Sequence, residues 1–286
     1  MTEQLVTHHE VGPAYAAALD VLAGRRLVVL TGAGLSTDSG IPDYRGPGST
    51  ARMPMTYSEF VGSARARQRY WARSHVGWSR MRGAHPNAGH LALARIDPEL
   101  LITQNVDGLH EAAGSQRVVA LHGRIDEVVC LACGSVQPRA DLHARLDELN
   151  PGWLVAHSAV ETLPDGDVEL DDTDDFVVPD CARCGGVLKP HVVFFGENAP
   201  KEKVRRCFEA VDALSDPEPD RRGALLVAGS SLTVMSGLRF VKRAARDDLP
   251  VVVVNRGATR GDDLATLTVH AGTSEFLTDL ARRRGR

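Results

Sequence analysis

The chain has 286 residues, of which 43% are hydrophobic and 24% charged, and its formal net charge is −4. This length can bury a full core, the composition is typical of a soluble globular protein, and the charge gives no general affinity for nucleic acid or anionic membranes. No apolar run approaches the roughly 20 residues that span a bilayer. Residues 1–24 contain no Arg or Lys, which argues against secretory and mitochondrial targeting peptides. We therefore expect a cytoplasmic protein that binds neither nucleic acid nor membrane directly.

The first part of the chain predicts a helix, a buried strand and a glycine-rich turn. Residues 15–23 are rich in Ala and Leu, and the β-branched run 27–30 follows them. Gly32 and Gly34 then allow a tight turn, and residues 36–39 are of types that cap helices. A strand, such a turn and a helix N-terminus together can bind phosphate, because unpaired N–H groups point at the anion. The glycine spacing matches neither the dinucleotide fingerprint nor the P-loop, so an ordinary strand-to-helix turn remains open at this point.

Apolar runs recur along the chain and are separated in several places by helical patterns, including residues 56–82 and a capped segment that ends at Ala94. This alternation predicts an α/β fold: a Rossmann-like, mostly parallel sheet with helices on both faces. Polar residues follow the runs, at the edge where open α/β sheets bind ligands. The expected strands are 27–30, 100–103, 118–121, 192–195, 224–228 and 251–254, and the polar residues are Gln104, Asn105, Asp107, His122, Ser230, Ser231, Asn255 and Arg256.

Two Cys-x-x-Cys pairs interrupt this pattern, and each is followed by Gly. Cys130 and Cys133 form the first pair, and Cys181 and Cys184 form the second. Four thiolates can hold Zn²⁺ in a closed, tetrahedral, structural site, although the 47 residues between the pairs exceed the usual zinc-ribbon separation. The alternative is a pair of redox dithiols or disulfides. Cys207 lies alone in a helical pattern, and we expect it to pack in the core.

The segment from Glu161 to Asp180 holds nine acidic residues and no basic one. A solvated, disordered surface loop is the interpretation that this composition favours. A docking surface for basic segments of a partner is the alternative.

The stretch Gly-Ala-Gly-Leu-Ser-Thr-Asp-Ser-Gly-Ile-Pro-Asp-Tyr-Arg, residues 32–45, closely resembles the signature of the sirtuins, which are NAD-dependent protein-lysine deacylases. Further motifs extend the resemblance from about residue 25 to about residue 275; they are Gln104–His110, Leu121-His122-Gly123, Lys189–Glu197, Gly229–Leu232 and Asn255–Gly257. The resemblance implies an enzyme that uses NAD as co-substrate and removes acyl groups from protein or peptide lysine. The products would be free lysine, nicotinamide and O-acyl-ADP-ribose, and zinc would be structural.

The resemblance also implies roles for individual residues. His122 would be the general base, in agreement with an ordinary pKa near neutrality. Val193 and Phe194 would lie beside the acyl-lysine, where a substrate peptide would pair as an added strand. Tyr44 replaces the Phe that is commoner in the family. The residues implied to contact NAD are Gly32, Ala33, Gly34, Thr37, Asp43, Tyr44, Arg45, Gln104, Asn105, Val106, Asp107, Gly229, Ser230, Ser231, Asn255, Arg256, Gly257 and Thr273.

Tyr70 and Arg73 are three residues apart, so they share one face of a helix. A Tyr hydroxyl and a guanidinium together suit a carboxylate. Desuccinylating and demalonylating sirtuins carry a Tyr-x-x-Arg pair of this kind, and the wider stretch resembles class II sirtuins. The hypothesis is a preference for acyl chains that end in a carboxylate over plain acetyl; a solvated Arg-rich helix face is the alternative.

These features predict three parts. Residues 1–47, 86–125 and 189–286 form the NAD-binding part, 48–85 a helical module with the cofactor loop, and 126–188 a zinc-ribbon module with an acidic insertion. Protein ADP-ribosyl transfer on the same scaffold remains an alternative activity. A nicotinamide-dependent oxidoreductase fits less well, because the glycine spacing is not that of the dinucleotide fingerprint. A zinc ribbon that binds nucleic acid also fits less well, because the ribbon segment is acidic where phosphate binding needs Lys and Arg.

Overall fold

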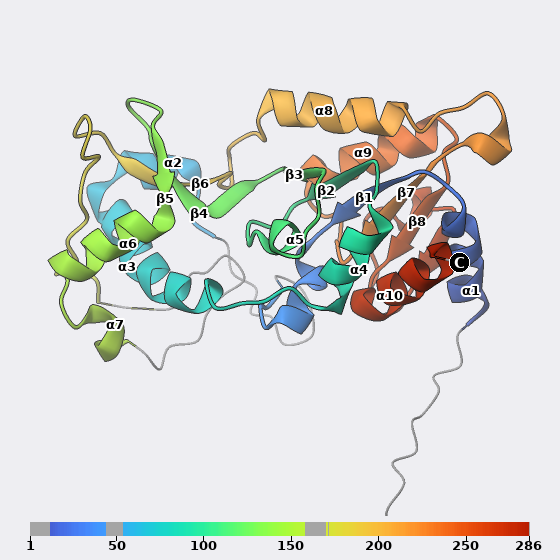
Figure 1. Cartoon of the computed structure of the whole chain (residues 1–286). Coiled ribbons are helices and arrows are strands. Elements are labelled where there is room, and N and C mark those ends of the chain that lie inside the picture. The colour runs from blue at the N-terminus through green and yellow to red at the C-terminus, as the bar shows by residue number, and fades with distance from the viewer. Residues whose placement is uncertain (1–11, 44–53, 158–169, 171, 286) are drawn as a thin grey trace, which may run out of the picture.

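The computed structural model describes residues 12–43, 54–157, 170 and 172–285, which form an α/β part and a smaller module beside it (Figure 1). The α/β part is built on six strands that are all parallel to their neighbours, in the order β3-β2-β1-β7-β8-β9. The central strands are buried along their whole length, as expected for a parallel sheet covered on both faces. The strands are β1 Leu27–Thr31, β2 Leu100–Thr103, β3 Val118–Ala120, β7 Ala224–Ala228, β8 Val251–Val254 and β9 Leu267–Val269.

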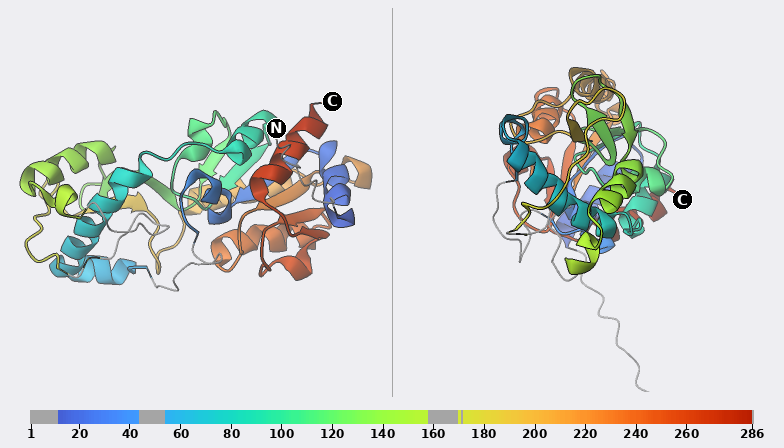
Figure 2. Two further views of the ribbon diagram at one scale, coloured as in Figure 1. Left: turned by 90° about the horizontal axis from the view of Figure 1, so that it is seen from below. Right: turned by 90° about the vertical axis from the view of Figure 1, so that its left-hand side faces the viewer.

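Helices cover both faces of this sheet (Figures 1 and 2). One face packs on α1 Pro13–Ala23, α4 Ala88–Ile96 and α10 Thr273–Arg284, and the other on α8 Lys201–Asp212 and α9 Met235–Arg246. Asn87 caps α4 by accepting hydrogen bonds from the backbone N–H groups of Gly89 and His90. Cys207 lies wholly inside the α8–α9 core, where burial raises the pKa of its thiol to about 12, so the expected packing role is confirmed.

The smaller module has a three-stranded antiparallel sheet, β5-β4-β6. Its strands are β4 Gly123–Cys130, β5 Val136–Pro138 and β6 Leu188–Val192, and its helices are α2 Tyr57–Gly62, α3 Ala64–Met81, α6 Arg139–Leu149 and the short α7 Trp153–Ala156. One apolar cluster joins these elements around Phe60, Trp71, Leu142 and Phe176. The helical segment before the sheet and the cysteine-bearing segment therefore share a core.

The predicted fold class is confirmed, but one expected strand is wrong and one is missed. Residues 192–195 do not join the parallel sheet, because the chain there leaves β6, which pairs with β4 in the antiparallel sheet. The sixth parallel strand is instead β9, an edge strand with partly exposed residues and a central Thr, so it lacks the continuous apolar run of the inner strands. The three-part division of the chain stays a prediction.

The acidic segment is not a free, solvated loop where the structure describes it, which corrects that interpretation for Leu170 and residues 172–180. Phe176 is buried in the module core, and Asp174 makes an ion pair with Arg65 of α3 at 3.0 Å. Gln68 of α3 donates to the carbonyl oxygens of Asp174 and Phe176. Aromatic and aliphatic residues among the carboxylates thus anchor this stretch to the module. Residues 161–169 and 171 of the segment lie outside the described residues.

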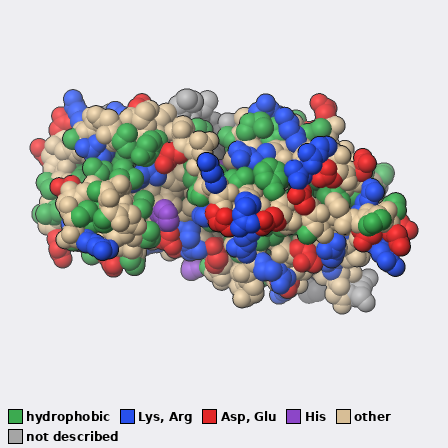
Figure 3. Space-filling view, turned by 90° about the horizontal axis from the view of Figure 1, so that it is seen from above, with side chains coloured by type: hydrophobic (Ala, Val, Ile, Leu, Met, Phe, Trp, Pro, Cys, Tyr) green, Lys and Arg blue, Asp and Glu red, His purple; other side chains and the backbone are tan. Residues whose placement is uncertain are grey.

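The face that carries α8 mixes basic and acidic side chains (Figure 3). On α8 itself, Arg205 bonds to both Glu202 and Glu209. Such a mixture does not provide the basic surface that a nucleic-acid backbone requires. Within the described ranges, no helix combines the length and the apolar character needed to cross a bilayer.

Candidate active site

The glycine-rich turn lies at the point where the strand order of the parallel sheet reverses. The chain passes from β1 to β2 on one side, whereas β7 leads to β8 on the other, so the loops after β1 and β7 face each other. They approach so closely that a Cβ on Gly32 would lie 2.8 Å from the carbonyl oxygen of Gly229. Gly229 itself has a φ of +68°, and the N–H of Gly34 donates to its carbonyl oxygen at 2.9 Å. Glycine is therefore required on both sides of this crevice.

The expected α-helix after the turn is wrong. Two short 3₁₀ helices follow instead, Ala33–Leu35 and Thr37–Ser39, and Gly40 at φ +82° ends the second one. Pro42 comes two residues later, so the chain cannot continue a helix. Residues 36–39 accordingly make no helix cap: Thr37 Oγ1 donates to the carbonyl of Gly34. An anion at this turn would bind to turn N–H groups, without a long helix dipole behind them.

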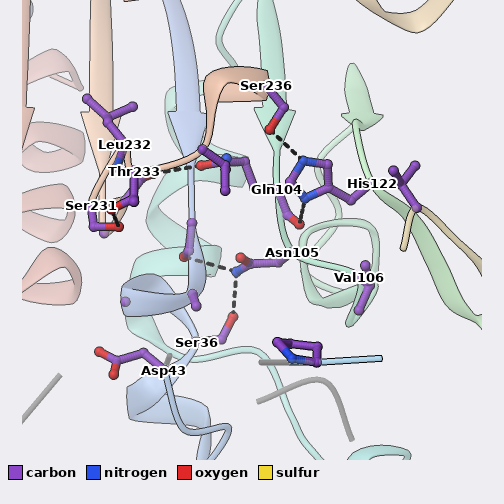
Figure 4. A pocket seen from close by; sticks show the side chains of 18 of the residues that line it. Ser36, Asp43, Gln104, Asn105, Val106, His122, Ser231, Leu232, Thr233 and Ser236 are labelled. Carbon is purple, nitrogen blue, oxygen red and sulfur yellow. Dashed lines mark hydrogen bonds between the residues drawn. The ribbon is translucent and has the colours of Figure 1, made fainter. Parts of the chain in front are cut away.

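A polar network joins this turn to the loop after β2 (Figure 4). Asn105 Nδ2 donates to the Gly32 carbonyl and to Ser36 Oγ, both at 3.0 Å. Ser36 Oγ in turn donates to a carboxylate oxygen of Asp107 at 2.7 Å, and the other oxygen accepts from the backbone N–H of Leu109. Two of the predicted residues are thus held in fixed orientations through Ser36, a buried residue that the sequence interpretation considered only as a possible helix cap.

His122 follows β3 and has a hydrogen-bond partner at each ring nitrogen (Figure 4). Nδ1 lies 3.0 Å from the carbonyl oxygen of Gln104, and Nε2 lies 2.8 Å from Ser236 Oγ. Because a carbonyl can only accept, Nδ1 carries the proton, and Nε2 accepts from the Ser236 hydroxyl. Burial lowers the pKa of His122 below its usual value. The imidazole is therefore neutral near pH 7, with a lone pair on Nε2, as a general base requires.

Ser236, at the start of α9, is the second residue of this site that sequence reasoning missed. The polar residues predicted from the sequence come directly after strands, whereas Ser236 lies eight positions beyond the end of β7. The signal available in the sequence was a Ser-Gly pair at the beginning of an amphipathic helix. The loop between β7 and α9 is fixed by Ser230 Oγ, which donates to Gln104 Oε1 at 2.6 Å and accepts from the Leu232 N–H.

These groups line one cleft of about 1100 Å³. Arg239 and Arg260, which the sequence analysis did not single out, also line it and add positive charge. Tyr44 and Arg45 lie outside the described residues. The structure brings together, as lining residues, His122 and the predicted NAD contacts Gly32, Ala33, Gly34, Thr37, Asp43, Gln104, Asn105, Val106, Asp107, Gly229, Ser230, Ser231, Asn255, Arg256, Gly257 and Thr273.

The cleft continues to the segment that follows β6. The N–H of Val193 donates to the carbonyl oxygen of His122 at 2.7 Å, which ties this segment to the loop that carries the imidazole. Phe194 is buried, and its ring contacts Phe60 and Tyr70 with centroids 5.3 and 5.2 Å apart. Val193, Phe194 and Tyr70 all line the cleft, which is therefore aromatic and aliphatic at this end.

The structure does not place Arg73 at the cleft with Tyr70. Arg73 is not a lining residue, and its Nε and Nη2 donate to the carbonyl oxygen of Leu170 at 3.2 and 2.8 Å. Residues three apart on a helix point about 60° apart, which is enough here for Tyr70 to face the cleft while Arg73 faces the segment that contains Leu170. The pairing inferred from the spacing therefore does not fit the geometry.

The four cysteines of the two Cys-x-x-Cys pairs converge beside β4. Their sulfurs lie within 4.8 Å of one another, and all four are free thiols. Zn–S bonds of 2.3 Å place tetrahedral sulfurs about 3.8 Å apart, and Cys130 and Cys184 are separated by 3.5 Å. A Cβ on Gly186 would lie 2.9 Å from the Cys130 sulfur, so glycine there keeps the space free. This donor set fits a closed zinc site of four thiolates.

Comparison with known proteins agrees with these features. The model of the Sir2 family matches residues 32–236. The NAD-dependent protein deacetylase 1 of Mycobacterium avium is 53% identical over 268 residues, and the match covers 91% of this chain and 92% of the relative. The NAD-dependent protein deacetylase 1 of Streptomyces coelicolor is 52% identical, and the match covers 93% of this chain and 88% of the relative. Among solved structures, a Sir2 protein with a p53 peptide and NAD+ is similar with a TM-score of 0.71 and 30% identity, covering 94% of this chain and 98% of that one.

Proposed function

The chain belongs to the Sir2 family, and on this premise we propose that it is an NAD-dependent protein-lysine deacylase. It removes acyl groups from lysines of proteins or peptides and releases nicotinamide and O-acyl-ADP-ribose. Relatives about half identical over most of the chain are named NAD-dependent protein deacetylases, and similar Sir2 structures hold NAD+ with a peptide or an acetylated peptide. The single observation in this chain that carries the proposal is the position of His122: it lines the cleft beside the glycine-rich crevice, and its Nδ1 lies 3.0 Å from the carbonyl oxygen of Gln104.

We propose that NAD lies along the crevice between the loops after β1 and β7. Gly32–Gly34 and Thr37 would line the phosphates, and Gly229–Ser231, Asn255–Gly257 and Thr273 would hold the adenosine side. When bound, NAD supplies the ADP-ribosyl group that accepts the acyl group. Asn105 and Asp107 would orient the nicotinamide end, since the Ser36 network fixes both side chains.

His122 Nε2 would take a proton from a ribose hydroxyl, which must first replace Ser236 as the partner of that nitrogen. The carbonyl of Gln104 keeps the proton on Nδ1 and stabilises the imidazolium once it forms. The acyl-lysine would lie against Tyr70, Val193 and Phe194, which exclude water from that end of the cleft. Zinc held by Cys130, Cys133, Cys181 and Cys184 would stabilise the module and take no part in these steps.

Incubation with NAD and an acetyl-lysine peptide tests this proposal. We expect nicotinamide release that depends on the acyl group, together with the deacylated peptide. Transfer of ADP-ribose onto protein without deacylation would favour the ADP-ribosyltransferase alternative. Appearance of the absorbance of reduced nicotinamide would favour an oxidoreductase.

Replacing Ser236 with Ala is expected to move the acidic limb of the kcat/KM profile to higher pH, by up to about one unit. The Ser236 hydroxyl donates to neutral Nε2 and therefore favours the unprotonated imidazole. Without this bond the pKa of His122 rises, so a larger fraction is protonated and inactive at any pH near that pKa. The pH dependence of kcat/KM measures the shift. Ser236→Thr retains a hydroxyl and should keep the wild-type profile; an unchanged limb in the Ala variant would contradict the role.

Replacing Arg73 with Met is expected to leave the ratio of desuccinylation to deacetylation within about twofold of wild type, because the guanidinium bonds to Leu170 and does not line the cleft. Rates with acetyl- and succinyl-lysine peptides measure this ratio. A selective loss of desuccinylation in the variant would restore the hypothesis that Arg73 reads a carboxylate.

A further inference from the structure

A second cluster of metal-ligating side chains lies in the smaller module, away from the four cysteines and outside the residues that line the cleft. His75 comes from α3, and His143 and Asp147 come from α6, where they are four residues apart and share one face. The mechanism proposed above uses none of these three residues. Their ligand atoms all lie within 4.8 Å of one another.

The carboxylate of Asp147 lies near the Nε2 atoms of both imidazoles. One oxygen is 3.1 Å from His75 Nε2, and the other is 3.8 Å from His143 Nε2. The ring centroids are 4.2 Å apart, with the rings tilted by 46°. Ligands at 2.0–2.1 Å from a tetrahedral Zn²⁺ lie about 3.3 Å apart, so these separations are close to those of a bound ion.

The environment supplies ligands in the form that a metal needs. Both imidazoles are buried, and burial lowers the pKa of His75 and lowers that of His143 to about 4, so both rings are neutral. Asp147 is about half exposed, which leaves a path for an ion and a position for water. Two imidazoles and one carboxylate, with an open fourth position, are a common donor set for Zn²⁺ and related divalent metals.

We propose that His75, His143 and Asp147 form a second, exchangeable site for Zn²⁺ or a similar divalent transition metal, which joins α3 to α6. Two features make it weaker than the four-cysteine site. The Nδ1 atoms of both rings have no partner in the described part of the chain, so binding through Nε2 leaves their N–H groups without the usual acceptor. The buried guanidinium of Arg139 is near enough to disfavour positive charge on both rings. Occupancy should therefore follow the free metal concentration.

Equilibrium dialysis of the full-length protein against buffered Zn²⁺ tests this inference. As free Zn²⁺ rises, we expect uptake by the wild-type protein to increase from about one to about two ions per chain. Asp147→Asn should bind the second ion at least about tenfold more weakly, because it removes the anionic ligand while keeping the size and exposure of the side chain. His143→Ala should abolish this second binding step.

Glu148→Gln is the matched control, since Glu148 is an exposed neighbour on the same helix and the change removes the same charge. It should bind zinc like the wild-type protein. Thermal unfolding in the presence of a chelator shows whether Asp147→Asn is folded, so that a failure to fold is recognised as such. Equal uptake by wild type and Asp147→Asn over the whole range would overturn the proposal. Uptake reduced equally in Asp147→Asn and Glu148→Gln would also overturn it, because it would indicate general surface charge.

Discussion

Replacing His122 with Ala should lower turnover by a factor on the order of 100 or more while leaving the affinity for NAD nearly unchanged. The variant loses the Nε2 lone pair, which is held in the cleft by the bonds of the ring to Gln104 and Ser236. The loops proposed to hold the dinucleotide do not depend on the imidazole, because the Ser36 network and the contact between Gly34 and Gly229 fix them. Steady-state kcat and the NAD dissociation constant, measured separately, distinguish the two effects.

His85→Ala is a suitable control, since His85 is exposed and does not line the cleft. It should retain the turnover of the wild-type protein. Near-normal turnover in His122→Ala would remove this residue from the role of general base. A parallel loss of NAD affinity would show that the side chain shapes the site.

The second large effect concerns the four cysteines. The double variant Cys181→Ser, Cys184→Ser should reduce the zinc retained after purification and dialysis from about one per chain to nearly none, and it should destabilise the smaller module. The two pairs lie on separate segments, one at the end of β4 and one before β6, and a shared ion would join them. Because a zinc site contributes binding free energy directly to folding, its loss should lower the unfolding temperature markedly.

Elemental analysis and thermal unfolding of the same preparations check this prediction. Cys207→Ala is the matched control for removal of a thiol, since Cys207 is buried in the other core and far from the zinc site in the fold. It should keep one tightly bound zinc per chain, although its core is less well packed. Zinc content equal to wild type in the double variant would rule out these ligands.

The sequence predicted those parts of the protein that depend on local pattern. The inner strands are continuous apolar runs, because both faces of a parallel sheet are buried, and four of them were placed correctly. The predicted cofactor residues that the structure describes line one cleft, because the carboxyl ends of parallel strands meet at one edge. The role of each residue in binding stays a prediction.

The features that were missed depend on contacts between distant segments. Residues 192–195 look like a core strand, but pairing of β6 with β4 takes the preceding residues into the smaller sheet. Ser236 and His122 are 114 residues apart, and no local pattern relates them. Arg73 has the expected helical spacing from Tyr70, yet a carbonyl about a hundred residues away determines where its guanidinium lies. Periodicity specifies a helix face approximately; tertiary packing decides what each side chain contacts.

Transfer of the acyl group from acyl-lysine to ADP-ribose is the reaction that distinguishes a deacylase of this family from the alternatives. Mass spectrometry of the products of a peptide that carries a ¹³C-labelled acetyl-lysine tests it most directly. We expect the label on ADP-ribose, in an amount equal to the nicotinamide released and to the free lysine formed. Label released as free acetate from the earliest time points, without labelled ADP-ribose, would contradict it.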